Sequence, residues 1–227
     1  MKKIALIPAR GGSKRIPHKN IKSFCGKPII AYPIRTALES ALFDEVIIST
    51  DSEQIATIAQ DYGAKVPFMR PKHLSDDFTP TAAVAAHATD ELKLNDEDLL
   101  CVIYPTAPLL RQQTLTNALE SLLADTQKCF SFCALAYEYN PHRSFYIKNG
   151  KLNMLFPAHY LTRSQDLEPL FHDAGQFYWG KVGAWREQLP IFANHSCVVI
   201  ISPQEAQDID TLTDWHIAEM KYKALFE

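Results

Sequence analysis

The fold is decided by the stretch KIALIP at residues 3–8 and by the loop ARGGSKR at residues 9–15 that follows it. A short, nearly continuous apolar run is typical of a strand buried on both faces of a parallel sheet. The loop carries two glycines and three cations. Because ligands of open α/β sheets bind outside the carboxyl ends of the strands, we expect this loop to face a ligand.

Further apolar runs alternate with amphipathic segments. Strands are predicted at 45–50, 99–104 and 129–137, and helices at 29–42, 52–62, 81–94 and 114–125. Strand-like runs return at 176–179 and 197–201, and a final helix is predicted to begin at Thr211, with Asp214 completing a capping box. This alternation predicts an α/β fold with a mostly parallel sheet flanked by helices.

The pattern changes between residues 138 and 170. Asn140-Pro141 is a turn signal, and Asn149-Gly150 between two short apolar runs predicts a hairpin. We therefore expect one domain over residues 1–227, with an inserted arm at about 138–170. The arm is too irregular to bury itself well, so we expect it to pack against a second copy in a homodimer.

Charge is unevenly distributed. The chain has 23 basic and 26 acidic residues, but residues 1–38 hold nine of the basic residues and no acidic one. The net charge of −3 argues against nucleic acid and anionic membranes as partners, whereas the basic N-terminal region suits a compact anion.

Targeting signals and metal-binding cysteine patterns are not evident. The apolar run before Arg10 is too short for a signal-peptide core, and no run approaches the ~18–20 residues of a spanning helix. The five cysteines have neither zinc-site nor disulfide-framework spacing. A cytoplasmic location is therefore expected.

The loop after the first strand fits none of the common nucleotide motifs. The glycine after Gly12 is Gly26, which excludes GxGxxG and GxxxxGK[ST], and so disfavours dehydrogenases and P-loop NTPases. Paired glycines still allow backbone N–H groups close to an anion. A solvated basic loop is the alternative interpretation, weakened by the position of the loop at a strand end.

Asp208 and Asp210 form an acidic pair before the final helix. Side chains at i and i+2 of an extended segment point the same way, so both carboxylates can face one hard cation such as Mg²⁺. The alternative is an ordinary helix N-terminus with no metal. The spacing alone favours neither interpretation.

The stretch PARGGSKRIPHKN at residues 8–20 resembles the N-terminal signature of the cytidylyltransferases that activate sialic-acid-like sugars. Further matches follow in family order and cover the whole chain: STD at 49–51, RP at 70–71, LSDD at 74–77, PTAP at 105–108 and DIDT at 208–211. The resemblance implies a Rossmann-like nucleotidyltransferase fold.

The stretches LTRSQDLEP at 161–169 and HDAGQFYWG at 172–180 resemble the branch of that family that acts on pseudaminic acid. Enzymes acting on neuraminic acid commonly have Gln in place of Tyr104, and Arg-Pro-Asn-Gly in place of residues 172–175. Both departures fall in the expected sugar pocket and leave the CTP site unaffected.

The resemblance implies a reaction in which the anomeric hydroxyl of a nonulosonic acid attacks the α-phosphate of CTP and pyrophosphate leaves. Such chemistry depends mainly on positioning and charge neutralisation. The resemblance to the family also favours Mg²⁺ as the ligand of Asp208 and Asp210. The catalytic residues implied are Arg10, Lys14, Lys19 and Asp210; the CTP-binding residues are Arg10, Gly11, Gly12, Ser13, Lys19, Asn20 (ribose), and Arg70, Thr79 and Thr81 (cytosine).

The sugar acid needs a cation for its carboxylate and polar groups for its substituents. The aromatic side chains in the same segment could line the sugar pocket, but they could equally be residues of the hydrophobic core. The residues expected to contact the sugar acid are Tyr104, Arg163, Gln165, His172, Gln176 and Tyr178.

Other interpretations remain. The acidic sugar could instead be legionaminic, neuraminic or an eight-carbon keto acid. A non-catalytic nucleotide-sugar-binding relative is a different class of protein, but a pure binder would not need the pair Asp208 and Asp210.

Overall fold

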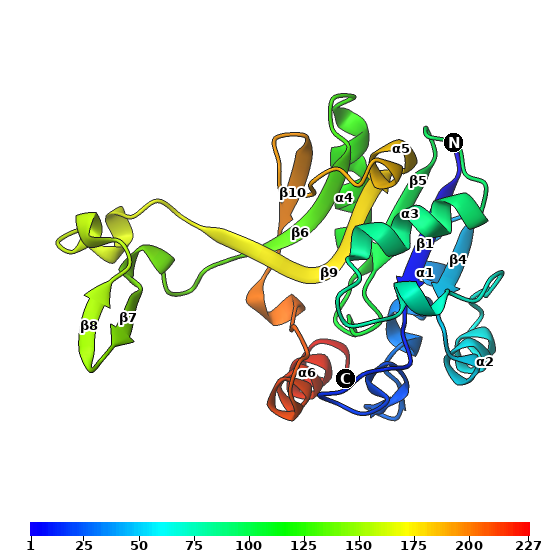
Figure 1. Ribbon diagram of the computed structural model, residues 1–227, viewed down its shortest axis with the longest axis horizontal. Helices are drawn as coiled ribbons and strands as arrows, with labels where there is room; N and C mark the ends of the chain where they lie inside the picture. The colour runs from blue at the N-terminus through cyan, green and yellow to red at the C-terminus, as the bar shows by residue number, and fades with distance from the viewer.

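The central sheet has six strands in the order β10-β6-β9-β5-β1-β4 (Figure 1). The computed structural model describes every residue from Met1 to Glu227. The strands are β1 (Lys3–Pro8), β4 (Glu45–Ser49), β5 (Leu99–Ile103), β6 (Phe130–Ala136), β9 (Phe171–Lys181) and β10 (Ser196–Ile200).

Strand β9 runs antiparallel to both of its neighbours, β5 and β6, and every other neighbouring pair is parallel. The prediction of a mostly parallel sheet is therefore confirmed. Strand β1 pairs with β4 on one side and with β5 on the other. The loop after β1 therefore begins between the carboxyl ends of two parallel strands. In such sheets this is where a ligand binds.

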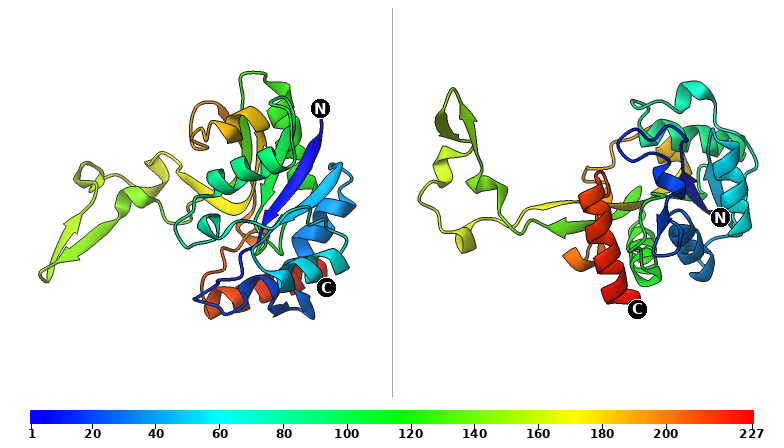
Figure 2. Two further views of the ribbon diagram at one scale, coloured as in Figure 1. Left: turned by 45° about the vertical axis from the view of Figure 1, so that its right-hand side comes forward. Right: turned by 90° about the horizontal axis from the view of Figure 1, so that it is seen from below.

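Helices cover both faces of the sheet (Figure 2). On β1, Ala5 and Ile7 pack in the cluster that includes α1 (Ala31–Glu39), α2 (Glu53–Asp61) and α4 (Gln112–Ala124). Ile4 and Leu6 pack in the opposite cluster, with α3 (Thr81–Glu91) and α5 (Val182–Arg186). This alternation makes a three-layer body. The helices predicted from the sequence are present, and α5 is one that was not predicted.

The last helix, α6 (Leu212–Phe226), packs against the N-terminal segment. Thr211 and Asp214 form the capping box that was predicted. The shared cluster joins residues from opposite ends of the chain. It includes Phe24 of β2 (Ser23–Phe24), the strand that pairs with β3 (Lys27–Pro28) in a small hairpin. The segment 208–210 is therefore held beside the first loop, as the views in Figures 1 and 2 agree.

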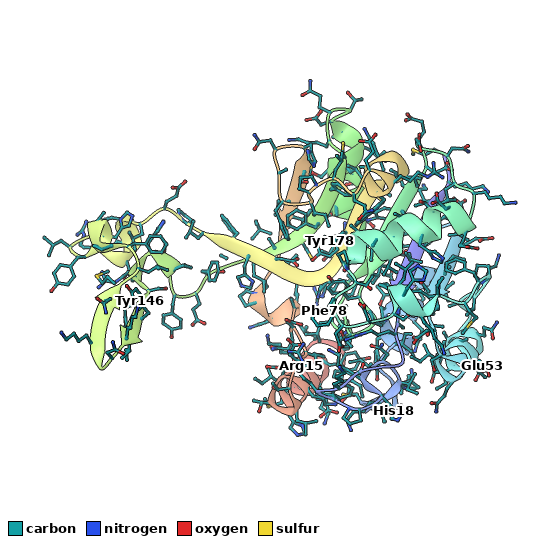
Figure 3. The ribbon with its side chains drawn as sticks, viewed as in Figure 1. Arg15, His18, Glu53, Phe78, Tyr146 and Tyr178 are labelled. Atoms are coloured by element: carbon teal, nitrogen blue, oxygen red, sulfur yellow. The ribbon has the colours of Figure 1, made fainter.

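Residues 137–170, called the arm below, project from the body between β6 and β9 (Figure 3). The arm contains the hairpin β7 (Phe145–Lys148) and β8 (Lys151–Met154). Its turn residues have positive φ, 53° at Asn149 and 73° at Gly150, as a tight hairpin turn requires.

Two further properties concern the chain as a whole. All five cysteines are free thiols, and Cys101 and Cys133 are buried. No helix combines the length and apolar character that crossing a bilayer would require.

Candidate active site

A polar cavity of about 380 Å³ lies where β1 and β5 end. That volume is within the range of small-molecule sites. It brings together four segments of the chain, residues 8–20, 70–84, 104–106 and 208–210, and most of the predicted nucleotide-binding residues line it. The lining includes Arg10, Ser13, Lys19, Asn20, Arg70, Thr79, Thr81, Tyr104, Asp208 and Asp210.

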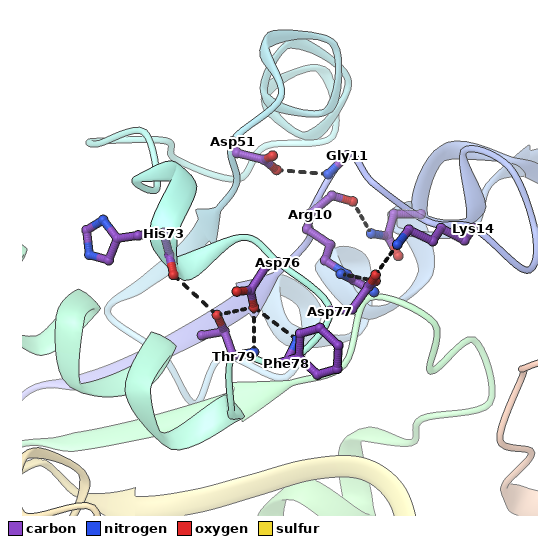
Figure 4. A network of polar contacts seen from close by, with 10 residues as sticks. Arg10, Gly11, Lys14, Asp51, His73, Asp76, Asp77, Phe78 and Thr79 are labelled. Carbon is purple, nitrogen blue, oxygen red and sulfur yellow. Dashed lines mark hydrogen bonds and ion pairs between the residues drawn. The ribbon is translucent and has the colours of Figure 1, made fainter.

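Asp77 neutralises two of the cations predicted to hold the triphosphate. Its Oδ1 lies 2.6 Å from Nη1 of Arg10, and its Oδ2 lies 2.5 Å from Nζ of Lys14 (Figure 4). The hydrogen bonds from Lys14 and Arg10 lower the pKa of the Asp77 carboxyl. Lys14 does not line the main cavity; it lies with Arg10, Arg15 and Asp77 in a smaller hollow next to it.

The two glycines of the loop behave differently from the prediction that both cradle phosphate. The Gly11 amide donates a hydrogen bond of 2.8 Å to Oδ1 of Asp51. A Cβ at Gly11 would lie 3.2 Å from Cβ of Ser52, whereas one at Gly12 would meet nothing. Gly11 is therefore explained by its close approach to the start of α2, and its N–H is already used. The backbone at Gly12 is unobstructed, and neither glycine lines the main cavity.

Lys19 links the first loop to the segment before α6. Its Nζ donates a hydrogen bond of 2.7 Å to the carbonyl oxygen of Ile209 and lies 3.7 Å from Oδ1 of Asp210. Burial lowers the pKa of Lys19, although Asp210 and Asp208 oppose that shift. Next to it, the buried Asn20 donates from Nδ2 to the carbonyl oxygen of Arg10 at 3.0 Å, which fixes the shape of the loop.

Asp208 and Asp210 both face the cavity. Burial, and then the neighbouring charge of Asp210, raise the pKa of Asp208. Asp210 is 2.7 Å from Nη1 of Arg15. Two oxygen ligands beside a predicted polyphosphate suit Mg²⁺, which usually takes one or two carboxylates together with phosphate oxygens and water. The donor set therefore fits that ion.

Arg70 contributes a buried guanidinium without a partner. The residue is only 6% exposed, and its Nε and Nη2 atoms make no hydrogen bond. Burial lowers its pKa, opposed by the charge of Asp51. Buried polar groups are nearly always hydrogen-bonded, so a guanidinium in this state on a cavity wall indicates a ligand acceptor.

Thr79, Thr81 and Tyr104 line the end of the cavity next to α3 and β5. The Thr81 and Tyr104 hydroxyls lie 3.4 Å apart. The hydroxyl of Thr79 is 2.7 Å from Oδ1 of Asp76, and so it is engaged within its own turn (Figure 4).

Three residues expected to contact the sugar acid lie on β9 outside the cavity lining. The Gln176 amide donates to the carbonyl oxygen of Glu205 at 2.6 Å and accepts from the Cys133 thiol, so it is a buried structural group. The prediction that Gln176 contacts the sugar does not fit that position. Tyr178 is buried beneath Tyr104, with ring centroids 5.7 Å apart, and its hydroxyl donates to Asp173.

His172 and the arm residues are also outside the cavity of this chain. His172 is exposed and packs on Tyr137, with ring centroids 4.7 Å apart. Arg163 pairs with Asp166 at 2.7 Å, and Gln165 lies in the same short helix of the arm as Asp166. The arm extends away from the body in Figures 1 and 3, so the structure does not bring Arg163 or Gln165 to their own chain's cavity.

The acidic partners of the cations are not evident from the sequence motifs. Asp77 lies in the LSDD stretch and Asp51 in the STD stretch, and neither stretch by itself indicates an ion pair with the first loop. The pairing of Arg15 with Asp210 likewise follows only from the structure. The available signal was the mismatch between an acid-free N-terminal region and conspicuous short acidic motifs elsewhere.

Comparisons with known proteins identify the family and the relatives of this chain. Residues 4–212 match the family model described as cytidylyltransferase. The chain is 45% identical, over its full length and 99% of the relative, to pseudaminic acid cytidylyltransferase of Campylobacter jejuni subsp. jejuni serotype O:2. It is 30% identical, over 96% of the chain and 95% of the relative, to CMP-N,N'-diacetyllegionaminic acid synthase of Legionella pneumophila.

Among solved structures, CMP:2-keto-3-deoxy-manno-octonic acid synthetase in complex with CTP superposes with a TM-score of 0.72, over 99% of each chain, at 18% identity. That likeness shows the nucleotidyltransferase fold. Since the family match includes the sheet, the cation-lined loop and the arm, the chain belongs to the cytidylyltransferase family.

Proposed function

We propose that this chain transfers the cytidylyl group of CTP to pseudaminic acid, giving CMP-pseudaminic acid and pyrophosphate. The choice of sugar is supported by the full-length relatives at 45% identity, which are pseudaminic acid cytidylyltransferases, against 30% for the legionaminic acid relative. The stretches 161–169 and 172–180 support the same choice.

The observation that carries the proposal is the unpartnered guanidinium of Arg70. A buried cation without an acceptor is unfavourable unless a ligand completes it. Arg70 lines the same cavity as Arg10, Lys19 and Asn20, which is where a nucleotide with a polar base and several phosphates would be bound.

In the proposed reaction the anomeric oxygen forms a bond to the α-phosphorus while the bond to the pyrophosphate oxygen breaks. Arg10, Lys14 and Lys19 would neutralise the charge that develops on the leaving pyrophosphate. The hydrogen bond from Lys19 to Ile209 would hold its ammonium in place, so little reorganisation is needed during the reaction.

Asp208 and Asp210 would hold Mg²⁺. When bound, the ion would screen the phosphate oxygens and orient the triphosphate. Within the protein, Lys19 and Arg15 balance the charge of the two carboxylates, and Arg15 would have to exchange its partner when a metal binds.

We also propose that the protein is a homodimer formed through the arm. Many large apolar side chains of the arm are exposed, and a surface of this kind marks an interface. They are Tyr139, Phe145, Tyr146, Ile147, Leu152, Leu155, Tyr160 and Leu161. If Arg163 and Gln165 contact the sugar acid, they must do so in the cavity of a second copy, because their own cavity lies away from the arm.

The experiment that tests the function is a pyrophosphate-release assay. The protein is given CTP and Mg²⁺ with pseudaminic, legionaminic, neuraminic or eight-carbon keto acid in separate reactions, and product masses are determined. We expect CMP-pseudaminic acid to form with the highest kcat/KM. A higher value for another acid would correct the substrate, and no product with any acid would leave a non-catalytic nucleotide-sugar binder.

Sedimentation tests the homodimer. We expect the mass of two chains, and the mass of one chain after residues 144–155 are replaced by a short Gly-Ser linker. A monomer mass for the unaltered chain at every concentration would contradict the dimer.

A further inference from the structure

One carboxylate pairs with two of the cations that the proposed function assigns to phosphate. Asp77 bridges Arg10 and Lys14 with one oxygen on each, at 2.6 and 2.5 Å. The side chains of Arg10 and Asp77 are about one-third exposed, so their pair is only partly screened by water. Lys14 is 80% exposed, and Asp77 is the one acidic partner of its ammonium.

Asp77 lies in a loop that is held from within. Oδ1 of Asp76 accepts hydrogen bonds from the amides of Phe78 and Thr79, at 2.9 and 2.7 Å, and from the Thr79 hydroxyl (Figure 4). The adjacent Phe78 is 91% exposed and packs in no core cluster. The turn thus keeps its shape without being anchored by apolar packing, and its tip can move as a unit with little loss of contact.

We propose that Asp77 is an internal counter-ion that competes with polyphosphate for Arg10 and Lys14. It holds these two cations in position in the free protein, leaves them when CTP binds, and returns as pyrophosphate departs. The inference rests on the proposed function, because that function supplies the polyphosphate.

The competition follows from charge and geometry. A carboxylate and a phosphate offer the same kind of acceptor to guanidinium and ammonium groups, and a cation already paired with a carboxylate attracts a phosphate less strongly. The free energy of binding CTP or pyrophosphate is therefore less favourable by the free energy of the two Asp77 ion pairs, which must break when the ligand binds. The benefit is faster product release, because weaker retention of pyrophosphate means a faster dissociation.

The test compares three variants with the wild type in binding of CTP, pyrophosphate and cytidine, each titrated alone by calorimetry. Asp77→Asn removes the charge and keeps the shape, and Asp77→Glu keeps the charge. Glu45→Gln is the matched control, because Glu45 pairs with Lys65 at 2.7 Å elsewhere on the surface and its loss changes the net charge equally.

We expect Asp77→Asn to bind pyrophosphate and CTP about three- to tenfold more tightly, the size expected from losing two partly exposed ion pairs. Cytidine affinity should stay unchanged. Because two more unneutralised cations face the ligand, pyrophosphate binding should also weaken more steeply with salt. Asp77→Glu should bind within about twofold of the wild type, and Glu45→Gln should match it.

Unchanged or weaker pyrophosphate binding in Asp77→Asn would overturn the inference and leave the proposed function intact. The same would follow if Glu45→Gln tightened binding equally, because the effect would then be one of net charge. A wild-type protein that binds neither CTP nor pyrophosphate would overturn the proposed function together with the inference.

Discussion

The ammonium of Lys19 donates a 2.7 Å hydrogen bond to the carbonyl oxygen of Ile209, joining two residues that are 190 positions apart. The contact fixes the acidic segment 208–210 against the basic first loop. Lys19 therefore contributes both to the shape of the site and to its charge.

We expect Lys19→Ala to lower kcat/KM for CTP about ten- to a hundredfold, because a charge-assisted hydrogen bond contributes roughly 1.5–3 kcal/mol. Steady-state kinetics with varied CTP measure the effect. Lys27→Ala removes a cation of the same N-terminal region that lies outside the cavity, and it should behave as the wild type. Equal constants for Lys19→Ala and Lys27→Ala would contradict the role of Lys19.

Asp210→Asn tests the metal site. We expect turnover at limiting Mg²⁺ to fall at least about tenfold, since replacing a ligand weakens metal affinity by that order or more. The measurement is the initial rate as a function of Mg²⁺ concentration, together with a thermal-melting curve that shows the variant is folded.

Arg15→Gln is the control for Asp210→Asn, since it breaks the 2.7 Å pair with Asp210 and keeps the carboxylate. A fall in turnover at limiting Mg²⁺ in Arg15→Gln equal to that in Asp210→Asn would assign the effect to the ion pair. Wild-type rates in Asp210→Asn at limiting Mg²⁺ would remove the metal assignment altogether.

Arg70→Met separates function from stability. Removing a buried guanidinium whose Nε and Nη2 have no partner should leave the melting temperature of the ligand-free protein unchanged or raise it by about 2–4 °C. CTP binding should weaken about tenfold or more, and the stabilisation of the protein by added CTP should shrink accordingly. A strongly destabilised variant with normal CTP affinity would show that Arg70 is structural.

Subunit mixing tests whether the arm serves a second copy. As separate proteins, Lys19→Ala is expected to keep about 1–10% of the wild-type kcat/KM for CTP, and Arg163→Ala is expected to be similarly impaired. Mixing them after mild dissociation should restore up to about a quarter of the wild-type activity, because random pairing makes half of the pairs mixed, each with one intact site. No recovery in mixtures that sedimentation shows to be mixed dimers would exclude a contribution of Arg163 in trans.

The capping box of α6 gives a pH dependence. The hydrogen bond from the Thr211 hydroxyl lowers the pKa of Asp214, so its contribution to stability is fully present above the unfolded-state pKa and is lost as the pH falls through the folded-state pKa. We expect the difference in unfolding free energy between wild type and Asp214→Asn to be larger at pH 7 than at pH 3. Urea titrations at both pH values measure it, and an equal difference at both would contradict the assignment.

The body of the fold could be predicted because its strands and helices carry strong local signals. The run at residues 3–8 and the cap at Ser52, whose side chain accepts from the amide of Ile55, are local features that the structure reproduces. The helix α5 was missed because five residues are too few to establish a period. The direction of β9 was not predicted, since pairing partners are set by tertiary contacts and not by composition.

The cations of the site could be predicted from the sequence, but the acidic residues that pair with them could not. Arg10, Lys19 and Arg70 line the cavity as expected from the motifs. The role of Asp77 depends on how loop 75–80 folds back over the first loop, and spacing along the chain carries no such information. The hydrogen bond of the buried Gln176 amide could not be predicted, because its acceptor, the carbonyl oxygen of Glu205, is 29 residues away.

The two ends of the arm join the body at adjacent strands, where Ala136 of β6 pairs with Phe171 of β9. The pairing of β6 with β9 therefore holds the two ends of the arm together. Because the entropy of closing a loop grows only slowly with its length, a longer or different arm would cost little additional entropy. The arm can accordingly be lengthened, shortened or replaced as a unit while the paired strands of the body stay the same.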